Sequence, residues 1–224
     1  MIRCTGVRHR RLTIPSLAAN ARQIAVIGPN GAGKTTFLGL CAGMEEPNKG
    51  EVTLFGRKPS EVRIGWVGEF PDRTMLFSRV YDEIASSLRF RHVSCRESDT
   101  RVHETAALLG IEGLLPKATD ELSGGEKALV AFAAALVHDP EVLILDEVDS
   151  HLDEEAGRRV ADAIKSRPGV SVIACTQNMD TAAEADLLLY IEEGCIRHAG
   201  TAEEVFEHLK ETCFYPAVWR VRGC

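Results

Sequence analysis

Residues 28–35, with the sequence Gly-Pro-Asn-Gly-Ala-Gly-Lys-Thr, constrain the fold of this chain more than any other feature. They follow a short apolar strand pattern at 23–28 and run into a helical pattern at 34–41. Glycines let the backbone curl so that its amides point inward, and the N–H groups at the start of a helix favour an anion. A strand, a glycine loop and a helix in this order predict an α/β fold that binds a nucleotide triphosphate.

Two side chains of this loop have expected roles in the chemistry. Lys34 brings a positive charge to the β and γ phosphates, so we expect it to act in catalysis. The hydroxyl of Thr35 can complete the octahedral shell of Mg²⁺. The residues that we expect to contact the nucleotide here are Gly28, Pro29, Asn30, Gly31, Ala32, Gly33, Lys34, Thr35 and Thr36.

Short runs of branched aliphatic residues, separated by helical patterns, predict a mainly parallel sheet. The run Val142 to Leu145 is typical of a central strand that is buried on both faces. Strand patterns stop between residues 70 and 140, where we expect a helical subdomain inserted into the α/β core. Strands are predicted at 23–28, 50–54, 62–67, 142–145, 170–174 and 187–191, and helices at 34–41, 80–90, 101–109, 128–137 and 203–210.

Two carboxylates stand at the C-terminal end of the predicted central strand. Ligands of parallel sheets bind at this end of the strands. We therefore expect Asp146 to hold Mg²⁺, directly or through water, and Glu147 to polarise the water that attacks the γ-phosphate.

A second candidate anion site lies at residues 122–127, Leu-Ser-Gly-Gly-Glu-Lys, just before the apolar run at 128–137. A Gly-Gly pair puts bare backbone amides at a helix start, where the partial charge is positive. Two helix N-termini suited to bind phosphate in one chain suggest two half-sites, each completed by a second copy or by a partner.

With these three motifs in this order, the chain resembles the ATP-binding cassette (ABC) ATPases. The resemblance implies ATP and Mg²⁺ as ligands and a P-loop NTPase core of the RecA-like type, with an N-terminal antiparallel β portion. It also implies that two cassettes stack head to tail, as a homodimer or a heterodimer. The residues that would then contact ATP on the opposite subunit are Ser123, Gly124, Gly125 and Glu126.

The same resemblance divides the single domain at 1–224 into three parts. The nucleotide-binding core is expected at 1–69 and 140–212, the helical subdomain at 70–139, and a C-terminal tail at 213–224. In the family, Asp153 matches the aspartate of a loop that contacts the second cassette.

A narrower likeness covers residues 70–85, which resemble the energy-coupling-factor importer ATPases, including the cobalt and nickel types. This likeness implies uptake of a metal ion or a vitamin-like molecule through an integral membrane subunit bound near residues 70–90. A chance match within a generic helical subdomain is the alternative. The matching residues are Pro71, Asp72, Val80, Glu83 and Ile84.

Two of the positions at which the chain departs from the family weigh most on catalysis. Glu69 stands where the family carries a glutamine that senses Mg²⁺, and its carboxylate can still face the metal. Gln177 stands at the position of the switch histidine, and glutamine can donate a hydrogen bond but cannot carry a proton. The chain is therefore either a transporter ATPase of reduced activity or a slow, even non-hydrolysing, clamp that pairs with a second ABC subunit.

The overall charge and the lengths of the apolar runs limit the classes of partner that we expect. The formal charge is −7, from 26 basic and 33 acidic residues, so we expect no nucleic-acid partner. No apolar run approaches the roughly 18 to 20 residues that span a bilayer, and the N-terminus shows no apolar signal core. We therefore expect a cytoplasmic chain, held at the inner face of the membrane by its partner.

Overall fold

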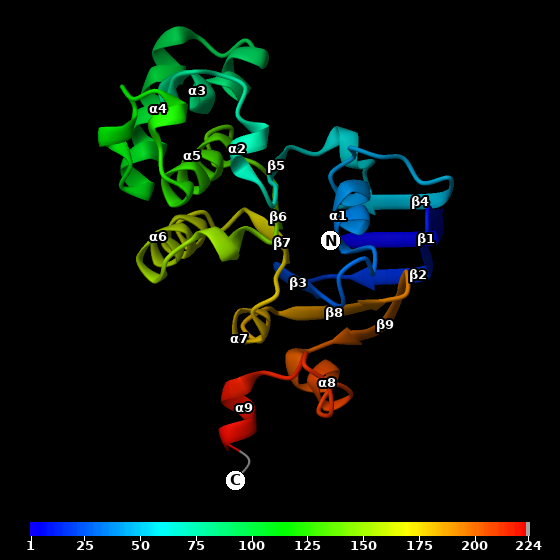
Figure 1. Ribbon diagram of the computed structural model, residues 1–224. Coiled ribbons are helices and arrows are strands. Elements are labelled where there is room, and N and C mark those ends of the chain that lie inside the picture. Colours follow the sequence, from blue (N-terminus) through cyan, green and yellow to red (C-terminus); the bar gives the residue numbers. More distant parts are fainter. Residues whose placement is uncertain (223–224) are drawn as a thin grey trace. The chain divides into compact units, whose positions relative to one another are not determined.

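The computed structural model describes residues 1–222, and their helices and strands are labelled in Figure 1. The chain forms two compact units. The first unit combines Met1–Val62 with Ser171–Cys224, and the second unit is Arg63–Val170. Each unit contains strands that pair in parallel and helices that pack against them.

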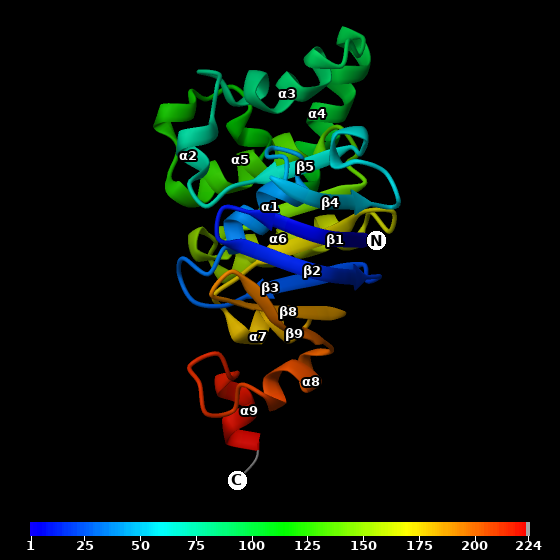
Figure 2. The same ribbon diagram turned by 90° about the vertical axis from the view of Figure 1, so that its right-hand side faces the viewer.

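An antiparallel sheet of three strands in the order β2-β1-β4 forms one part of the first unit (Figures 1 and 2). These strands are β1 (Ile2–His9), β2 (Leu12–Ala19) and β4 (Lys49–Leu54). On β1, Cys4 lies opposite Leu17 of β2 and Val52 of β4, and all three side chains are buried. This sheet is the N-terminal antiparallel portion that the family resemblance implies.

The other strands of the first unit run in the order β7-β3-β8-β9. Strand β3 (Gln23–Ile27) pairs in parallel with β7 (Ser171–Cys175) and with β8 (Leu187–Glu192). Strand β9 (Cys195–Gly200) returns antiparallel to β8. The helices of this unit are α1 (Lys34–Cys41), α7 (Met179–Ala182), α8 (Ala202–Glu207) and α9 (Ala217–Arg222), with a 3₁₀ turn η1 (Pro59–Glu61).

The second unit contains the parallel pair β5 (Ile64–Val67) and β6 (Val142–Asp146). Every residue of β6 is buried, as its branched aliphatic sequence predicts. Helices α3, α4 and α5 pack against one another in this unit (Figure 1). The helices are α2 (Pro71–Thr74), α3 (Val80–Phe90), α4 (Cys95–Leu109), α5 (Gly124–Leu136) and α6 (Glu154–Lys165), with 3₁₀ turns η2 (Glu112–Leu114), η3 (Thr119–Glu121) and η4 (Val148–His151).

Most predicted elements are present with small changes in their bounds. Helices α1 and α3 occupy the predicted residues, and the part of the chain between β5 and β6 that the structure describes holds helices and no strand. Helix α4 begins six residues before the predicted 101, because the Ser94 hydroxyl caps it by accepting a hydrogen bond from the Glu97 amide at 3.3 Å. Strand β9 was not predicted, since Arg197 and His198 interrupt its apolar pattern.

The segment beyond residue 212 joins the core of the first unit. Phe206 of α8 is fully buried, and its ring lies edge-to-face with those of Tyr215 and Trp219 at 6.3 and 5.4 Å. Phe214 packs on Tyr190 of β8 at 5.6 Å. Most of the predicted tail at 213–224 is therefore a packed segment that includes α9, and its last two residues lie outside the described ones. Among the described helices, none has both the length and the apolar character needed to cross a bilayer.

Candidate functional site

The loop between β3 and α1 has the backbone geometry of a phosphate cradle. Gly28 has φ 144°, and a Cβ added there would lie 2.0 Å from the carbonyl oxygen of Ile191 on β8, so only glycine fits. Gly33, at φ 106°, is the N-cap residue of α1, and no side chain accepts a hydrogen bond from the helix start there. The first turn of the helix carries no acidic residue. A helix start with neither a capping side chain nor an acid favours a bound anion.

Lys34 carries its positive charge inside this loop. The residue is only 5% exposed, and its Nζ donates hydrogen bonds to the carbonyl oxygens of Gly28 at 2.9 Å and Pro29 at 3.2 Å. A buried ammonium is costly unless it is paired, so an anion held by the same loop would stabilise it further. The loop and its lysine therefore fit a triphosphate.

Two segments of the first unit, around Arg11 and Gly194, brace this loop from outside. Arg11 Nη1 donates to the Gly31 carbonyl at 3.0 Å, and the Gly194 amide donates to the Ala32 carbonyl at 3.0 Å. The Gly194 carbonyl accepts a hydrogen bond from the Thr13 amide at 2.7 Å. The tight turn between β8 and β9 therefore links the start of β2 to the phosphate loop.

This bracing turn at Glu193 and Gly194 was not predicted, although its sequence carries a signal. Glu193 and Gly194 both have positive φ, at 49° and 77°, which is typical of a two-residue hairpin turn. Glycine at the second position supplies the positive φ that such a turn requires, so Gly194 is that signal. Nothing in the sequence could show that Gly194 also bonds to Ala32, because that contact joins residues far apart in the chain.

Gln177 lies beside the phosphate loop, where the switch position is expected. It follows β7, and its Nε2 donates to Oδ1 of Asn30 at 3.5 Å, a long hydrogen bond. The Asn178 side chain then caps α7 by accepting from the amides of Asp180 and Thr181. The first unit therefore brings Gln177 together with the loop at 28–36.

In the second unit, Asp146 and Glu147 stand at the end of β6. Asp146 is 3% exposed and ends the buried strand. Glu147 has φ 53° and ψ 28°, a left-handed backbone that costs a residue other than glycine about 1 to 3 kcal/mol. The Ser150 hydroxyl donates to the Glu147 carbonyl at 2.9 Å and holds the turn. Such strain is typical of functional sites.

The start of α5 carries a capping box. The Ser123 hydroxyl accepts from the Glu126 amide at 3.3 Å, and a Glu126 carboxylate oxygen accepts from the Ser123 amide at 2.8 Å. The amide and hydroxyl of Ser123 hold the pKa of Glu126 below its usual value, with Lys117 adding to the effect. Glu126 therefore fixes the helix start that begins with Gly124 and Gly125.

Glu69 lies in the second unit, and its side chain is exposed. Its carbonyl oxygen accepts a hydrogen bond from His151 Nε2 at 2.6 Å. Because a carbonyl only accepts, this nitrogen of His151 carries the proton. The contact fixes the backbone of Glu69, the residue that replaces the family's glutamine.

The described residues contain no cluster of three or more His, Cys, Asp or Glu side chains that would hold a metal by themselves. Mg²⁺ is usually held by one or two protein oxygens together with phosphate oxygens and water, and Thr35 in the first unit and Asp146 in the second unit each carry an oxygen of this kind.

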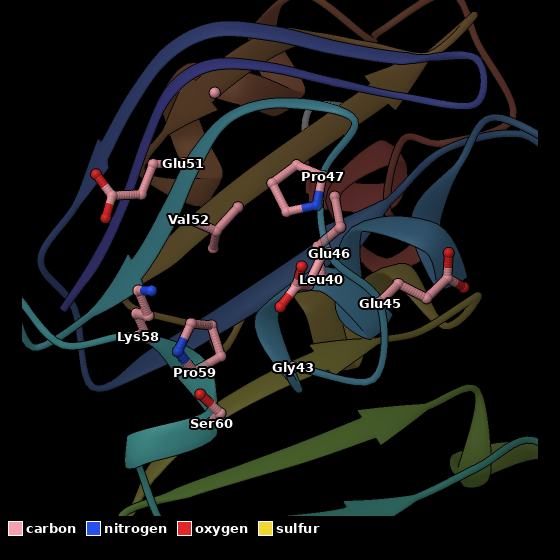
Figure 3. Close-up of a pocket in the computed structure, with 11 residues that line it drawn as sticks. Leu40, Gly43, Glu45, Glu46, Pro47, Glu51, Val52, Lys58, Pro59 and Ser60 are labelled. Carbon is pink, nitrogen blue, oxygen red and sulfur yellow. The ribbon is translucent and has the colours of Figure 1, made fainter.

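A hollow of about 330 Å³ lies elsewhere in the first unit, between the end of α1, β4 and η1 (Figure 3). Pro47, Val52 and Pro59 form part of its lining, with Glu46, Glu51 and Lys58 around them. Its lining contains none of the residues that we expect to contact nucleotide. This hollow is therefore separate from the candidate site.

A sequence model of the ABC transporter family matches residues 16–150. The chain belongs to the ABC transporter family. This result confirms the resemblance that the three motifs indicate.

Relatives in this family include energy-coupling factor transporter ATP-binding proteins. The protein EcfA1 of Latilactobacillus sakei is 31% identical over 204 residues, which cover 86% of this chain and 73% of the relative. EcfA1 of Mycoplasmopsis synoviae is 34% identical over 197 residues, covering 84% and 74% of the two chains. Both bear the name "Energy-coupling factor transporter ATP-binding protein".

Solved structures of ABC proteins share the fold. CbiO1 of Clostridium perfringens, described as part of the ABC transporter complex cbiONQ, superimposes with a TM-score of 0.80 at 24% identity. It covers 94% of this chain, and this chain covers 93% of it. A dimeric ATP-binding cassette bound to ADP and Pi gives a TM-score of 0.81 at 20% identity, covering 90% and 99% of the two chains. The predicted P-loop NTPase fold is confirmed.

This ABC protein is therefore an ATPase, the ATP-binding subunit of a transporter. The predicted enzyme class and the likeness to energy-coupling factor ATPases are both confirmed.

Proposed function

We propose that this ABC ATPase hydrolyses Mg²⁺-bound ATP to drive uptake of a metal ion or a vitamin-like small molecule through an integral membrane subunit. The observation that carries the proposal is the identity of 31 to 34% to energy-coupling factor ATP-binding proteins over most of both chains. The likeness of residues 70–85 to importers of this kind supports the same cargo class.

We assign the chemical steps to residues of each unit. In the first unit, the amides of the loop at 28–36 bind the phosphates and Lys34 stabilises their charge, while Gln177 donates a hydrogen bond toward the γ-phosphate. In the second unit, Glu147 orients and polarises the attacking water. Bound Mg²⁺ neutralises charge on the phosphates, and we assign Thr35, Asp146 and Glu69 as the residues that would hold it.

Two partners follow from this assignment. A second ABC subunit, identical or different, receives the helix start at Ser123–Glu126, which would contact ATP held by that subunit. An integral membrane subunit binds near residues 70–90, where Phe70, Leu76 and Phe90 are 41, 76 and 70% exposed. Large apolar side chains exposed in one segment favour protein contact. The chain would then work at the inner face of the membrane.

The proposed domain organisation assigns 1–69 and 140–212 to the nucleotide-binding core. It assigns 70–139 to the helical subdomain and 213–224 to a tail. Limited proteolysis tests this division, because cleavage should occur first near residues 70 and 140 if the helical part is a separate subdomain.

The ATPase test compares the purified chain with Glu147→Gln. We expect the variant to lose turnover by a factor on the order of 10² to 10⁴ while still binding ATP, since only the water-polarising group is changed. Glu203→Gln, an exposed carboxylate on α8, is the matched control and should keep full activity. Equal turnover by the chain and by Glu147→Gln would refute the assignment.

The transporter part needs a separate test. Affinity purification from detergent-solubilised membranes should recover an integral membrane protein, and alanine substitution of Leu76 should weaken the recovery. Cells that carry Glu147→Gln should lose uptake of one metal ion or vitamin. Recovery of ribosomes, or of soluble partners alone, would contradict the proposal.

A further inference from the structure

His151 contacts two segments of the second unit to which the proposed function gives separate roles. Its side chain reaches the loop after β5, where Nε2 donates to the Glu69 carbonyl at 2.6 Å. Its backbone carbonyl lies against the start of α5, since a Cβ added at Gly125 would be 3.5 Å from that oxygen. It is also the last residue of η4, the turn that follows Glu147.

The turn between Glu147 and His151 is short and held by its own hydrogen bonds. Glu147 begins it with a left-handed backbone, and the Ser150 hydroxyl donates to the Glu147 carbonyl. Val148 is 4% exposed and anchors the turn in the core. The Leu152 amide donates to the Asp149 carbonyl at 3.3 Å and closes the turn. A displacement of His151 would therefore also displace Glu147.

His151 also contacts the loop at residues 69–73, which carries the exposed ring of Phe70. The rings of His151 and Phe70 lie edge-to-face with centres 6.4 Å apart. The Arg73 guanidinium carbon lies 4.5 Å from the centre of the Phe70 ring. Phe70 is 41% exposed, whereas Pro71 is buried. The imidazole is thus a direct link between this loop and the Glu147 turn.

We propose that His151 is a positioning residue that ties the loop at residues 69–73 to the turn carrying Glu147, so that displacement of the loop alters catalysis. The inference rests on the proposed function, in which this loop faces the membrane subunit and Glu147 polarises water. His151 makes this link through its hydrogen bond to the Glu69 carbonyl and its ring contact with Phe70, and we expect the hydrogen bond to carry most of it.

Three substitutions separate the hydrogen bond from the ring. His151→Gln keeps a donor at a similar reach, His151→Phe keeps the ring and loses the donor, and His151→Ala loses both. His103→Ala is the matched control, because that histidine is exposed on α4 with 59% of its side chain accessible. Thermal melting of each purified full-length variant checks that it folds.

The first readout is ATP turnover by the full-length chain with Mg²⁺. We expect His151→Ala and His151→Phe to lower kcat about tenfold, because small misplacement of a catalytic group is costly. KM for ATP should change by less than about twofold, since the phosphate loop is untouched. His151→Gln should recover kcat to within about twofold of the wild type. Equal kcat for the wild type and His151→Phe, or no rescue by His151→Gln, would overturn the proposal.

The second readout does not depend on activity. Hydrogen–deuterium exchange at residues 68–74 should be faster in His151→Phe and His151→Ala and near the wild-type rate in His151→Gln and His103→Ala. If the exchange rate at residues 68–74 is unchanged in folded His151→Phe, His151 does not hold the loop and the proposal is overturned. A chain that hydrolyses no ATP, with exchange behaving as expected, would contradict the proposed function and leave the tie supported.

Discussion

Gly194 offers a sharp test of how the phosphate loop is held, through the substitution Gly194→Ala. This glycine has φ 77°, and an added Cβ would lie 2.0 Å from the Arg11 carbonyl oxygen. No flexible side chain can yield there, because the obstructing atoms are backbone. The turn between β8 and β9 would have to move, and with it the two hydrogen bonds that it makes to Thr13 and Ala32.

Gly56 provides the matched control for the backbone strain. It has φ 75°, and a Cβ added there meets nothing within 4 Å. Gly56→Ala should therefore lower the free energy of unfolding by about 1 to 2 kcal/mol, the cost of a left-handed alanine. Gly194→Ala carries the same cost and also loses two hydrogen bonds at about 0.5 to 1.5 kcal/mol each. Its expected excess over Gly56→Ala is about 1 to 3 kcal/mol.

Urea unfolding of the two variants measures this excess. Fluorescent ATP-analogue binding provides a second readout, because Ala32 belongs to the phosphate loop. Loss of about 1 kcal/mol of loop ordering corresponds to about fivefold weaker binding in Gly194→Ala and to no change in Gly56→Ala. If the two variants unfold alike and bind alike, the turn does not brace the loop and the reasoning fails.

Three further predictions concern other residues. Gln177→His should raise the turnover of the isolated chain, since histidine can carry a proton, and an unchanged kcat in steady-state assays would contradict this. Burial lowers the pKa of His138 below 6.5, so the unfolded chain binds more protons and stability should fall as the pH drops below about 6.5. His138→Gln, which can still donate to the Ile64 carbonyl, should flatten that decline in urea midpoints measured from pH 8 to pH 5, and parallel profiles would refute it. Asp153→Ala removes the cap that accepts from the Ala156 amide at 2.8 Å, and urea unfolding should show a loss of about 1 kcal/mol, whereas no loss would rule out the cap.

Local patterns predicted much of the fold because local physics decides those elements. Strand β6 begins with four branched aliphatic residues and ends at Asp146, and it is buried throughout. Helix α1 follows directly from the glycine loop and occupies its predicted residues. Strand β9 and helix α9 escaped prediction because their sequences mix charged and apolar residues without a clear period. Packing against β8 and Phe206, which acts at long range, stabilises these elements instead.

In the candidate site too, features set by neighbouring residues could be predicted from the sequence, whereas contacts between residues far apart in the chain could not. The phosphate loop was predicted from its motif and the two carboxylates from their place at the end of β6, whereas their assigned roles remain predictions. The capping box of Ser123 and Glu126 was readable, since serine followed three residues later by glutamate is its signature. The contact between His151 and Glu69 was not readable, because it joins residues 82 positions apart.

The capping box at the start of α5 has a consequence for association. Reciprocal hydrogen bonds between Ser123 and Glu126 order this helix end within the single chain. Under the proposed function, a second cassette that docks there would meet a preorganised surface. Conformational entropy that would otherwise be lost on docking is already lost during folding, which favours tight association. Acidification that protonates Glu126 would loosen the helix end and weaken association even where the contact surface itself carries no titrating group.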